Sequence, residues 1–287
     1  MPLTSCTRYT SPTDRVLILT PMMEAAPFLD GYFQRLFEVD HPKDHISLGF
    51  LVSTRTNPSS NDPTLAQLKT TLQRLSILGL YRKITLIHQT SKSDNYSHST
   101  RHLYNVQSSR RRVLAECRNT LLSWTLSDES WVLWLDVDVI EYSPQLISRL
   151  MAFHKDIIVP NCFRMEGSWW KKKLPYPYDR NNWHETLESL AHQRALDEED
   201  ILFEGYENQQ PTFRQSLADI QDPSLELVEL DGVGGTFTLV NATVHHHGIN
   251  FPLDPIGHQI ETEGFAKWAK IHNFSAFGAP HLMVYHA

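Results

Sequence analysis

The sequence has no hydrophobic run long enough to cross a membrane and no excess of positive charge. A transmembrane helix needs about 20 consecutive apolar residues, and no window of these 287 residues approaches that length. Residues 1–14 are rich in Ser, Thr and Pro and lack the apolar core of a signal peptide. We therefore expect a disordered N-terminal segment and a soluble chain. The formal net charge of −7 argues against nucleic acid or an anionic membrane as the main partner.

Cysteine is also scarce. The three cysteines, Cys6, Cys117 and Cys162, are unevenly spaced and form no metal-binding motif. An odd number cannot form a fully paired disulfide framework. Cys117 lies in a helical pattern and Cys162 follows a strand pattern, so we expect both to be core residues rather than catalysts.

In the first half of the chain, apolar patterns of strand and helix alternate. The expected strands cover residues 15–20, 45–52, 83–88 and 131–135, and the expected helices cover residues 25–39, 65–78 and 108–126. Pro21 is expected to close the first strand. This alternation predicts an α/β protein with a parallel, doubly wound sheet and right-handed crossovers.

The second half is less regular. A helix is expected to begin at Ser143–Pro144, because proline is favoured at the first helical position. We expect further strands at 156–160, 225–230, 235–240 and 282–286, and helices at 185–205 and 261–272. No internal repeat or linker interrupts the chain. The sequence therefore predicts one domain, 15–287, with a nucleotide-binding half of about 15–140 and an acceptor-side half of about 141–287.

Asp136 and Asp138 follow the apolar run 131–135, which is typical of a buried central strand. Ligands of open α/β sheets bind just beyond the carboxyl ends of the strands. Two carboxylates placed there repel each other unless a cation joins them, and hard oxygen ligands suit Mg²⁺ or Mn²⁺. The alternative is a strand-to-loop turn whose acids are solvated.

Three other segments have weaker patterns. Residues 163–183 are rich in aromatic and basic residues and show no periodicity. This segment is either a loop that lines a sugar or phosphate site or a surface loop whose rings pack on the core. The glycines of 231–235 fit close backbone approach to a ligand or a plain hairpin turn. His245, His246 and His247 are consecutive, so they cannot all face one ion, and we do not expect a metal site there.

Seven segments in order resemble the fungal Golgi mannan-polymerase mannosyltransferases, glycosyltransferase family 62. The resemblance covers nearly the whole chain from about residue 15 onward. Each motif is weak alone, and seven in order are specific. They are VLILTP (16–21), ISLGFLV (46–52), RNTLL (118–122), WLDVD (134–138), DGVGGTF (231–237), ETEGFA (261–266) and VYH (284–286).

The resemblance implies a GT-A (Rossmann-like) fold, GDP-mannose as donor, a Mn²⁺-type ion, and retaining transfer that forms an α-mannosidic linkage. It also implies a mannose-terminated glycan acceptor, in mannan or an N-glycan, and partner subunits of a mannan polymerase-like complex. Family members are type II Golgi membrane proteins. Their cytoplasmic tail and transmembrane anchor have no counterpart in the printed sequence, so the Golgi location is an expectation carried by the resemblance alone.

For the donor side, Asp138 is the expected direct metal ligand, with Asp136 sharing the ion or holding the ribose. His286 resembles the C-terminal histidine with which the family completes the metal site. Thr20 and Pro21, at the carboxyl end of the first strand, are expected to border the guanine–ribose pocket. Arg118 is a candidate for fixing the nucleotide, with a surface ion pair as the alternative.

Asp231 and Glu263 are the carboxylates that the motifs place nearest the acceptor, so we predict catalytic roles for them. Retention of configuration could use a carboxylate nucleophile or front-face attack guided by the leaving phosphate, and the sequence leaves both open. Two other functions also stay open. An apolar strand before Asp-X-Asp also occurs in aspartyl-phosphate phosphatases. In that fold the strand normally lies near the beginning of the chain, whereas three strands precede it here. A catalytically silent subunit that binds donor or glycan is the non-enzyme alternative.

Overall fold

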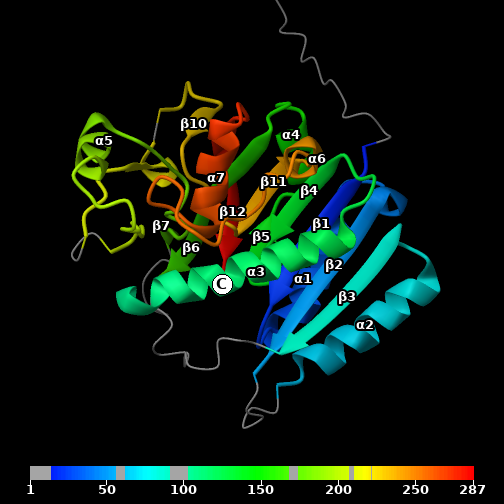
Figure 1. Cartoon of the computed structure of the whole chain (residues 1–287). Helices are drawn as coiled ribbons and strands as arrows, with labels where there is room; N and C mark the ends of the chain where they lie inside the picture. Colours follow the sequence, from blue (N-terminus) through cyan, green and yellow to red (C-terminus); the bar gives the residue numbers. More distant parts are fainter. Residues whose placement is uncertain (1–13, 56–61, 91–102, 168–173, 207–209, 221) are drawn as a thin grey trace, which may run out of the picture.

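The fold is built around one large mixed sheet. The computed structural model describes residues 14–55, 62–90, 103–167, 174–206, 210–220 and 222–287. Eight strands follow one another across the sheet in the order β10-β12-β6-β11-β4-β1-β2-β3, and β5 and β7 pair with β12 and β6 (Figure 1).

The first half of the chain forms the parallel part of the sheet, as predicted. Its strands are β1 (Val16–Met22), β2 (Ile46–Thr54), β3 (Lys83–Thr90) and β4 (Trp131–Leu135). The connecting helices are α1 (Leu29–Glu38), α2 (Thr64–Leu78) and α3 (Gln107–Thr125), and short 3₁₀ turns precede α1 and α3. Gly79 ends α2 with a φ of 59°, the left-handed conformation that glycine adopts without a steric penalty.

Pro21 does not close the first strand, contrary to the prediction. β1 continues through Pro21, which lies opposite Leu51 of β2. Pairing with β4 ends earlier, at Leu19 opposite Trp134. Beyond that point β1 has only one neighbour, so a residue without an N–H is tolerated there as it is on an edge strand.

The second half adds strands of both directions. β11 (Phe237–Asn241) runs antiparallel between β4 and β6 (Ile157–Glu166). The long β12 (Ala276–His286) then pairs parallel with β6. Three short strands complete this side of the sheet: β5 (Val139–Tyr142), β7 (Leu174–Pro177) and β10 (Val228–Leu230). β6 is longer than the predicted 156–160, because β12 and β7 both pair with its extension.

The helices of the second half are short. They are α4 (Leu146–Met151), α5 (Leu187–Gln193), α6 (Ala242–His246) and α7 (Glu261–Ile271), beside a small sheet of β8 (Trp183–His184) and β9 (Gln215–Ser216). The predicted helix at 185–205 was wrong beyond Gln193. Beyond Gln193 the chain forms turns, and Leu202 and Phe203 are buried in that non-helical part.

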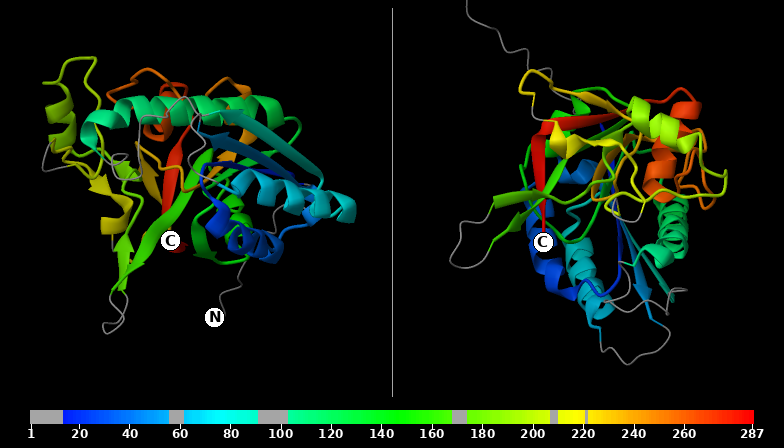
Figure 2. Two further views of the ribbon diagram at one scale, coloured as in Figure 1. Left: turned by 90° about the horizontal axis from the view of Figure 1, so that it is seen from below. Right: turned by 90° about the vertical axis from the view of Figure 1, so that its left-hand side faces the viewer.

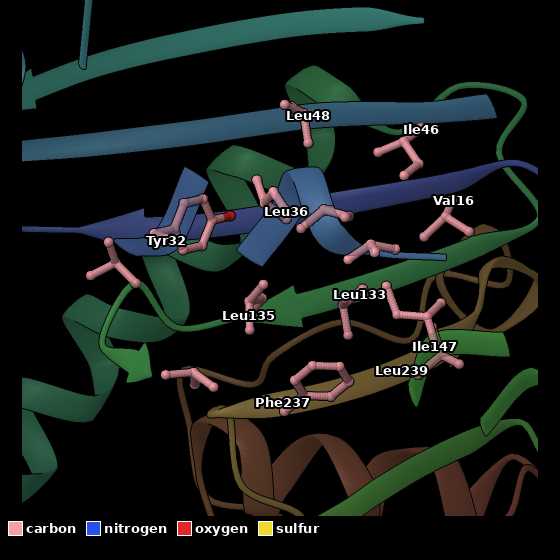
Figure 3. Close-up of a cluster of buried hydrophobic side chains, with 14 of the residues drawn as sticks. Val16, Tyr32, Leu36, Ile46, Leu48, Leu133, Leu135, Ile147, Phe237 and Leu239 are labelled. Carbon is pink, nitrogen blue, oxygen red and sulfur yellow. The ribbon is translucent and has the colours of Figure 1, made fainter. Parts of the chain in front are cut away.

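Two hydrophobic cores cover the two faces of the sheet. Side chains of α1, α2 and α4 pack on one face, and side chains of α3, α6 and α7 pack on the other. Figure 3 shows the first core, in which Leu133 and Leu135 of β4 lie between Leu36 of α1 and Phe237 of β11. The α/β class predicted from the sequence is confirmed. Within the described ranges, no helix is both long and apolar enough to cross a membrane.

Candidate active site

The predicted acidic pair lies in the turn between β4 and β5. Asp136 directly follows Leu135, and its backbone N–H donates to the carbonyl of Thr236 at 3.0 Å. β5 then pairs antiparallel with β12, which places Val139 opposite His286. The turn is therefore held between the start of β11 and the end of β12, at the carboxyl end of a buried strand as predicted.

The pairing of β5 with β12 brings His286 to Asp138. The His286 Nε2 lies 3.1 Å from the Asp138 Oδ1, and the N–H of Ala287 donates to the Asp138 carbonyl at 3.0 Å. The ring of Tyr178 stacks on the imidazole with centroids 3.7 Å apart and planes inclined by 17°. Burial alone would lower the pKa of His286, but the hydrogen bond and charge of Asp138 outweigh it and raise the pKa.

Asp136 lies in a strongly negative environment. Its pKa is raised to about 7, first by desolvation and then by the charges of Asp138 and Asp179, against the opposing effect of Arg118 and His286. The side chain is nevertheless 31% exposed. The turn thus holds negative charge that the protein compensates only in part, and a cation at its open side would relieve it.

Arg118 is buried on α3 and faces the acidic turn. Its Nε donates to Glu261 Oε1 at 3.0 Å, and its Nη2 lies 3.8 Å from Asp136 Oδ1. The guanidinium also lies over the ring of Trp134, 5.3 Å from its centroid. A Cβ on Gly235 would come within 2.2 Å of Nη2, so only glycine permits this approach.

Two features of the Arg118 arrangement are typical of a functional site. Glu261 has a φ of 55°, which is costly for a residue with a side chain. The Arg118 Nη1 is buried without a hydrogen-bond partner among the described residues, and a buried donor of this kind calls for a ligand or a water. The alternative of a surface ion pair is wrong, because Arg118 is only 5% exposed.

Thr20 and Pro21 lie at the end of β1, on the side of the predicted nucleotide pocket. The Thr20 hydroxyl is fully buried and lies 2.6 Å from the hydroxyl of Tyr32. Burial raises the pKa of Tyr32 well above its usual range, and the nearby charge of Asp136 adds to the effect. The Thr20–Tyr32 pair thus joins the end of β1 to α1, and a contact of Pro21 with a nucleotide stays a prediction.

Asp179 is a carboxylate of this site that the sequence analysis missed. Its charge contributes to the raised pKa of Asp136. Its Oδ1 accepts hydrogen bonds from the backbone and side-chain nitrogens of Asn181, at 3.2 and 3.1 Å. A Cβ on Gly234 would lie 1.8 Å from its Oδ2, and the N–H of Gly234 donates to Asn182 Oδ1 at 2.8 Å. The glycine-rich segment is therefore a close backbone approach to the Asp179 turn of the protein itself, and an approach to a ligand stays a prediction.

The structure does not bring Asp231 to the acidic pair. Asp231 follows β10, which pairs with the opposite end of β12 from His286, Leu230 lying beside Ala276. Its carboxylate binds the Lys270 ammonium and accepts from the N–H of Glu185 at 2.8 Å. Asp231 thus lines a separate, open pocket of about 520 Å³, together with Glu185, Leu190, Ile256, Gly257, Lys267, Lys270 and Ile271. Its catalytic role stays a prediction.

Glu263 is fully buried on α7, with both oxygens engaged. Oε2 forms an ion pair with Arg111, and Oε1 accepts from Trp183 Nε1 at 2.8 Å. Arg111 in turn donates to Asn181 Oδ1 at 3.2 Å, and Asn181 holds Asp179. These contacts favour an indirect role, in which Glu263 fixes the turn that carries Asp179. Its direct participation in catalysis stays a prediction.

Replacing Glu263 with glutamine is expected to lower the free energy of unfolding by about 3–5 kcal/mol, because it leaves the buried guanidinium of Arg111 without its counter-charge. Urea unfolding measures the change. The matched control is Glu229→Gln, since Glu229 forms an ion pair with Lys270 but is exposed, and its removal should change the stability by no more than about 0.5 kcal/mol. Equal stability of the Glu263→Gln and native proteins would contradict the structural role.

The predicted burial of two cysteines agrees with the structure, and one residue of the histidine run is also buried. His245 is buried, with its ring stacked on Phe265, and desolvation lowers its pKa to about 4. It is thus a core histidine. Cys117 and Cys162 are free thiols, both buried. Of the aromatic and basic segment, residues 168–173 lie outside the described residues.

Asp138 and His286 could hold a Mn²⁺-type ion, and the predicted three-residue set with Asp136 stays a prediction. Among the residues that the structure describes, no three His, Cys, Asp or Glu side chains are arranged to hold an ion. Asp138 and His286 form a carboxylate–imidazole pair, while Asp136 lies beside Arg118. Mg²⁺-type ions commonly take one or two protein ligands and complete their shell with phosphate oxygens and water, so this pair is sufficient.

Sequence comparison links the chain to fungal proteins. Residues 2–255 match the Anp1 family. The chain is 39% identical over 281 residues to the mannan polymerase complex subunit mnn9 of Schizosaccharomyces pombe, covering 95% of this chain and 80% of that protein. It is 33% identical over 287 residues to the mannan polymerase II complex ANP1 subunit of Saccharomyces cerevisiae, covering 95% of this chain and 55% of that protein.

Structural comparison identifies the fold. A mannosyltransferase of Pyrobaculum calidifontis, solved in complex with GDP-Man and Mn²⁺, superposes with a TM-score of 0.54 at 13% sequence identity, covering 96% of this chain and 58% of that chain. The Staphylococcus aureus protein TarS superposes with a TM-score of 0.51 at 12% identity, covering 95% of this chain and 36% of that one. The predicted GT-A fold is confirmed.

Proposed function

Because this chain belongs to the Anp1 family, we propose that it is a metal-dependent, retaining α-mannosyltransferase that moves mannose from GDP-mannose to a mannose-terminated glycan. The names of its relatives and its GT-A fold support a mannosyltransferase-type role. The donor, the metal and the stereochemistry are the proposed part.

The observation that carries the proposal is the meeting of Asp138 and His286 beside Asp136 at the carboxyl end of β4. Carboxylate and imidazole side chains at a strand end can bind an ion that a nucleoside diphosphate also binds. An ion held by Asp138 and His286 would act as a Lewis acid that stabilises the charge on the departing diphosphate. The hydrogen bond between His286 Nε2 and Asp138 Oδ1 keeps the two side chains together, an ion bound between them would replace its proton, and Tyr178 holds the plane of the ring.

Arg118 is proposed to fix the nucleotide side of the donor. Glu261 holds the guanidinium through Nε, which leaves the unpartnered Nη1 to donate to a phosphate or ribose oxygen. Preorganised donors of this kind stabilise developing charge without a reorganisation cost. Asp136, next to Arg118, is proposed to share the ion or accept a hydrogen bond from the ribose.

Asp179 is proposed to serve the sugar side of the reaction. Asn181 fixes one of its oxygens, and the other faces the Gly234 backbone. A carboxylate there can stabilise a cationic sugar, attack it as a nucleophile, or accept the proton of the acceptor hydroxyl. The proposal is that this group, rather than the distant Asp231, contacts the reacting atoms.

The names of the relatives, which describe them as mannan polymerase complex subunits, also support a proposal about partners and place. We propose that this chain works beside further subunits of such a complex in the Golgi. Co-purification from fungal membranes followed by identification of the bound chains would test the first part, and fluorescence co-localisation with a Golgi marker would test the second.

The proposed activity predicts that GDP is released from GDP-mannose in the presence of Mn²⁺ and not in the presence of EDTA. A panel of nucleotide sugars, each incubated with a mannose oligosaccharide, tests the donor, and nuclear magnetic resonance of the product tests retention at the new linkage. Release of GDP that occurs with Mn²⁺ and stops with EDTA would support the proposal. Binding of GDP-mannose without any turnover would favour a silent subunit, and release from other sugar nucleotides at equal rates would contradict the donor assignment.

A further inference from the structure

The hairpin formed by β6 and β7 extends beyond the candidate site. Figure 2 shows it projecting from the body of the protein, with the end of β12 beside its base. Arg164 lies opposite Tyr176, and Glu166 lies opposite Leu174. Because paired residues of an antiparallel sheet share a face, these four side chains lie on one side of the hairpin.

That side of the hairpin is continuous with the candidate site. On the neighbouring β12, His286 lies opposite Arg164, so the imidazole begins the same row. Tyr178 stacks on His286, and the Arg164 guanidinium lies 5.3 Å from the ring centroid of Tyr176. Arg164 also forms an ion pair with Glu166. We call the row of Arg164, Glu166, Leu174, Tyr176 and Tyr178 the hairpin face.

The hairpin face presents unusual groups to solvent. Tyr178 is 37% exposed, Tyr176 is 45% exposed and Leu174 is 59% exposed. Exposed apolar and aromatic groups that gather beside a site commonly mark a binding surface. They lie along the β7 side of the hairpin, opposite the ion pair of Arg164 and Glu166 on β6, so the surface offers aromatic rings beside charged hydrogen-bonding groups.

We propose that the hairpin face binds the sugar units that lie behind the reacting end of a glycan acceptor. This inference rests on the proposed function. Sugar rings have a C–H face that packs on aromatic rings, and their hydroxyls bond to paired guanidinium and carboxylate groups. Successive residues on one face of a strand are about 7 Å apart, a spacing comparable with one pyranose unit. The acceptor would therefore run outward from His286 along the hairpin, with Tyr178 nearest the reaction.

Two alternatives fit the hairpin face less well. The nucleotide belongs with the parallel strands β1 and β2, which lie across β4 and β11 from the hairpin. A protein partner could add a strand to the outer edge of β7, which pairs only with β6 among the described residues. Such a partner would use backbone groups, whereas the row that is continuous with the site is made of side chains.

The test compares acceptors of one and of four mannose units in the native protein and in Tyr176→Ala. We expect kcat/KM for the longer acceptor to fall roughly tenfold in the variant, the size expected for loss of one aromatic contact. Values for single mannose and the affinity for GDP should not change. Tyr176→Phe should keep the native values, because the ring remains. Met165→Ala is the matched control, since Met165 is exposed on the opposite face of the hairpin, beside Pro175.

Calorimetry measures the affinity for the tetrasaccharide directly, without any transfer. This measurement separates failure of the present inference from failure of the proposed activity. If the native protein binds the tetrasaccharide but transfers no mannose, acceptor binding by the hairpin face is supported and the proposed enzymatic activity is contradicted. Two results would contradict acceptor binding by the hairpin face. One is an equal loss of kcat/KM for the short and the long acceptor in Tyr176→Ala, and the other is a native affinity of this variant for the tetrasaccharide. A Tyr176→Ala variant that loses only a co-purifying protein assigns the surface to that partner and likewise overturns it.

Discussion

Replacing Asp138 with asparagine is expected to abolish Mn²⁺-dependent binding of GDP and to lower turnover by at least about 10²-fold. The substitution removes the charged member of the carboxylate–imidazole pair and weakens its hold on His286. Metal-bound diphosphate then loses its anchor, while the size of the side chain is preserved. Calorimetry of GDP with Mn²⁺ and then with EDTA measures the first effect, and GDP release from GDP-mannose measures the second.

The matched control is Glu141→Gln on the adjacent β5, because Glu141 is exposed and lies opposite Tyr285. It should bind GDP and turn over as the native protein does. His286→Ala should reproduce the Asp138→Asn defect. If Asp138→Asn binds GDP with the same dependence on Mn²⁺ as the native protein, the assignment of the metal site is wrong.

Asp179→Asn is expected to keep near-native affinity for GDP and Mn²⁺ and to lower the rate of transfer by about 10²–10⁴-fold, the usual contribution of a positioned acid or base. Asparagine retains an oxygen that can accept from Asn181, so the turn should keep its shape. What would be lost, under the proposed role, is a negative charge beside the reacting sugar. Binding by calorimetry and transfer under saturating donor distinguish the two effects.

Asp254→Asn is the control for this substitution, because the Asp254 side chain is 86% exposed and its only described ion pair is with the exposed Arg112. Its activity should match that of the native protein. An Asp179→Asn protein with full activity would exclude Asp179 from the chemistry and favour front-face attack without a protein nucleophile. An equal loss of GDP binding would instead assign Asp179 to the metal site.

The sequence predicted where the acidic pair lies in the fold, because that information is local. A continuous apolar run that ends in Asp136 and Asp138 describes a buried strand and its carboxyl end, and both follow from residues that are adjacent in the chain. His286 was different. Its pairing with Asp138 depends on β5 and β12, which are far apart in sequence, so only the family resemblance indicated it.

The surroundings of Asp179, Asp231 and Glu263 could not be predicted, for a related reason. Asp179 lies in a polar turn without a spacing motif, and its importance depends on Gly234, which packs against it from a distant segment. Asp231 and Glu263 belong to recognisable motifs. Their motif positions do not reveal that Lys270 binds the first, or that Arg111 and Trp183 enclose the second. Ion pairs between distant helices are a property of the packed structure and have no periodic signal.

The antiparallel insertion of β11 has a consequence for how the protein is made. β6 lies between β11 and β12, and both of these strands come after it in the chain. On a ribosome, the parallel unit of β1 to β4 can assemble early, whereas the buried first half of β6, Ile157–Cys162, lacks its partner strands until synthesis has passed Phe237. Unpaired strands of this kind are slow to fold and prone to aggregate. Chains interrupted between β6 and β11 are therefore expected to be insoluble and to depend on chaperones, even though their parallel half is intact.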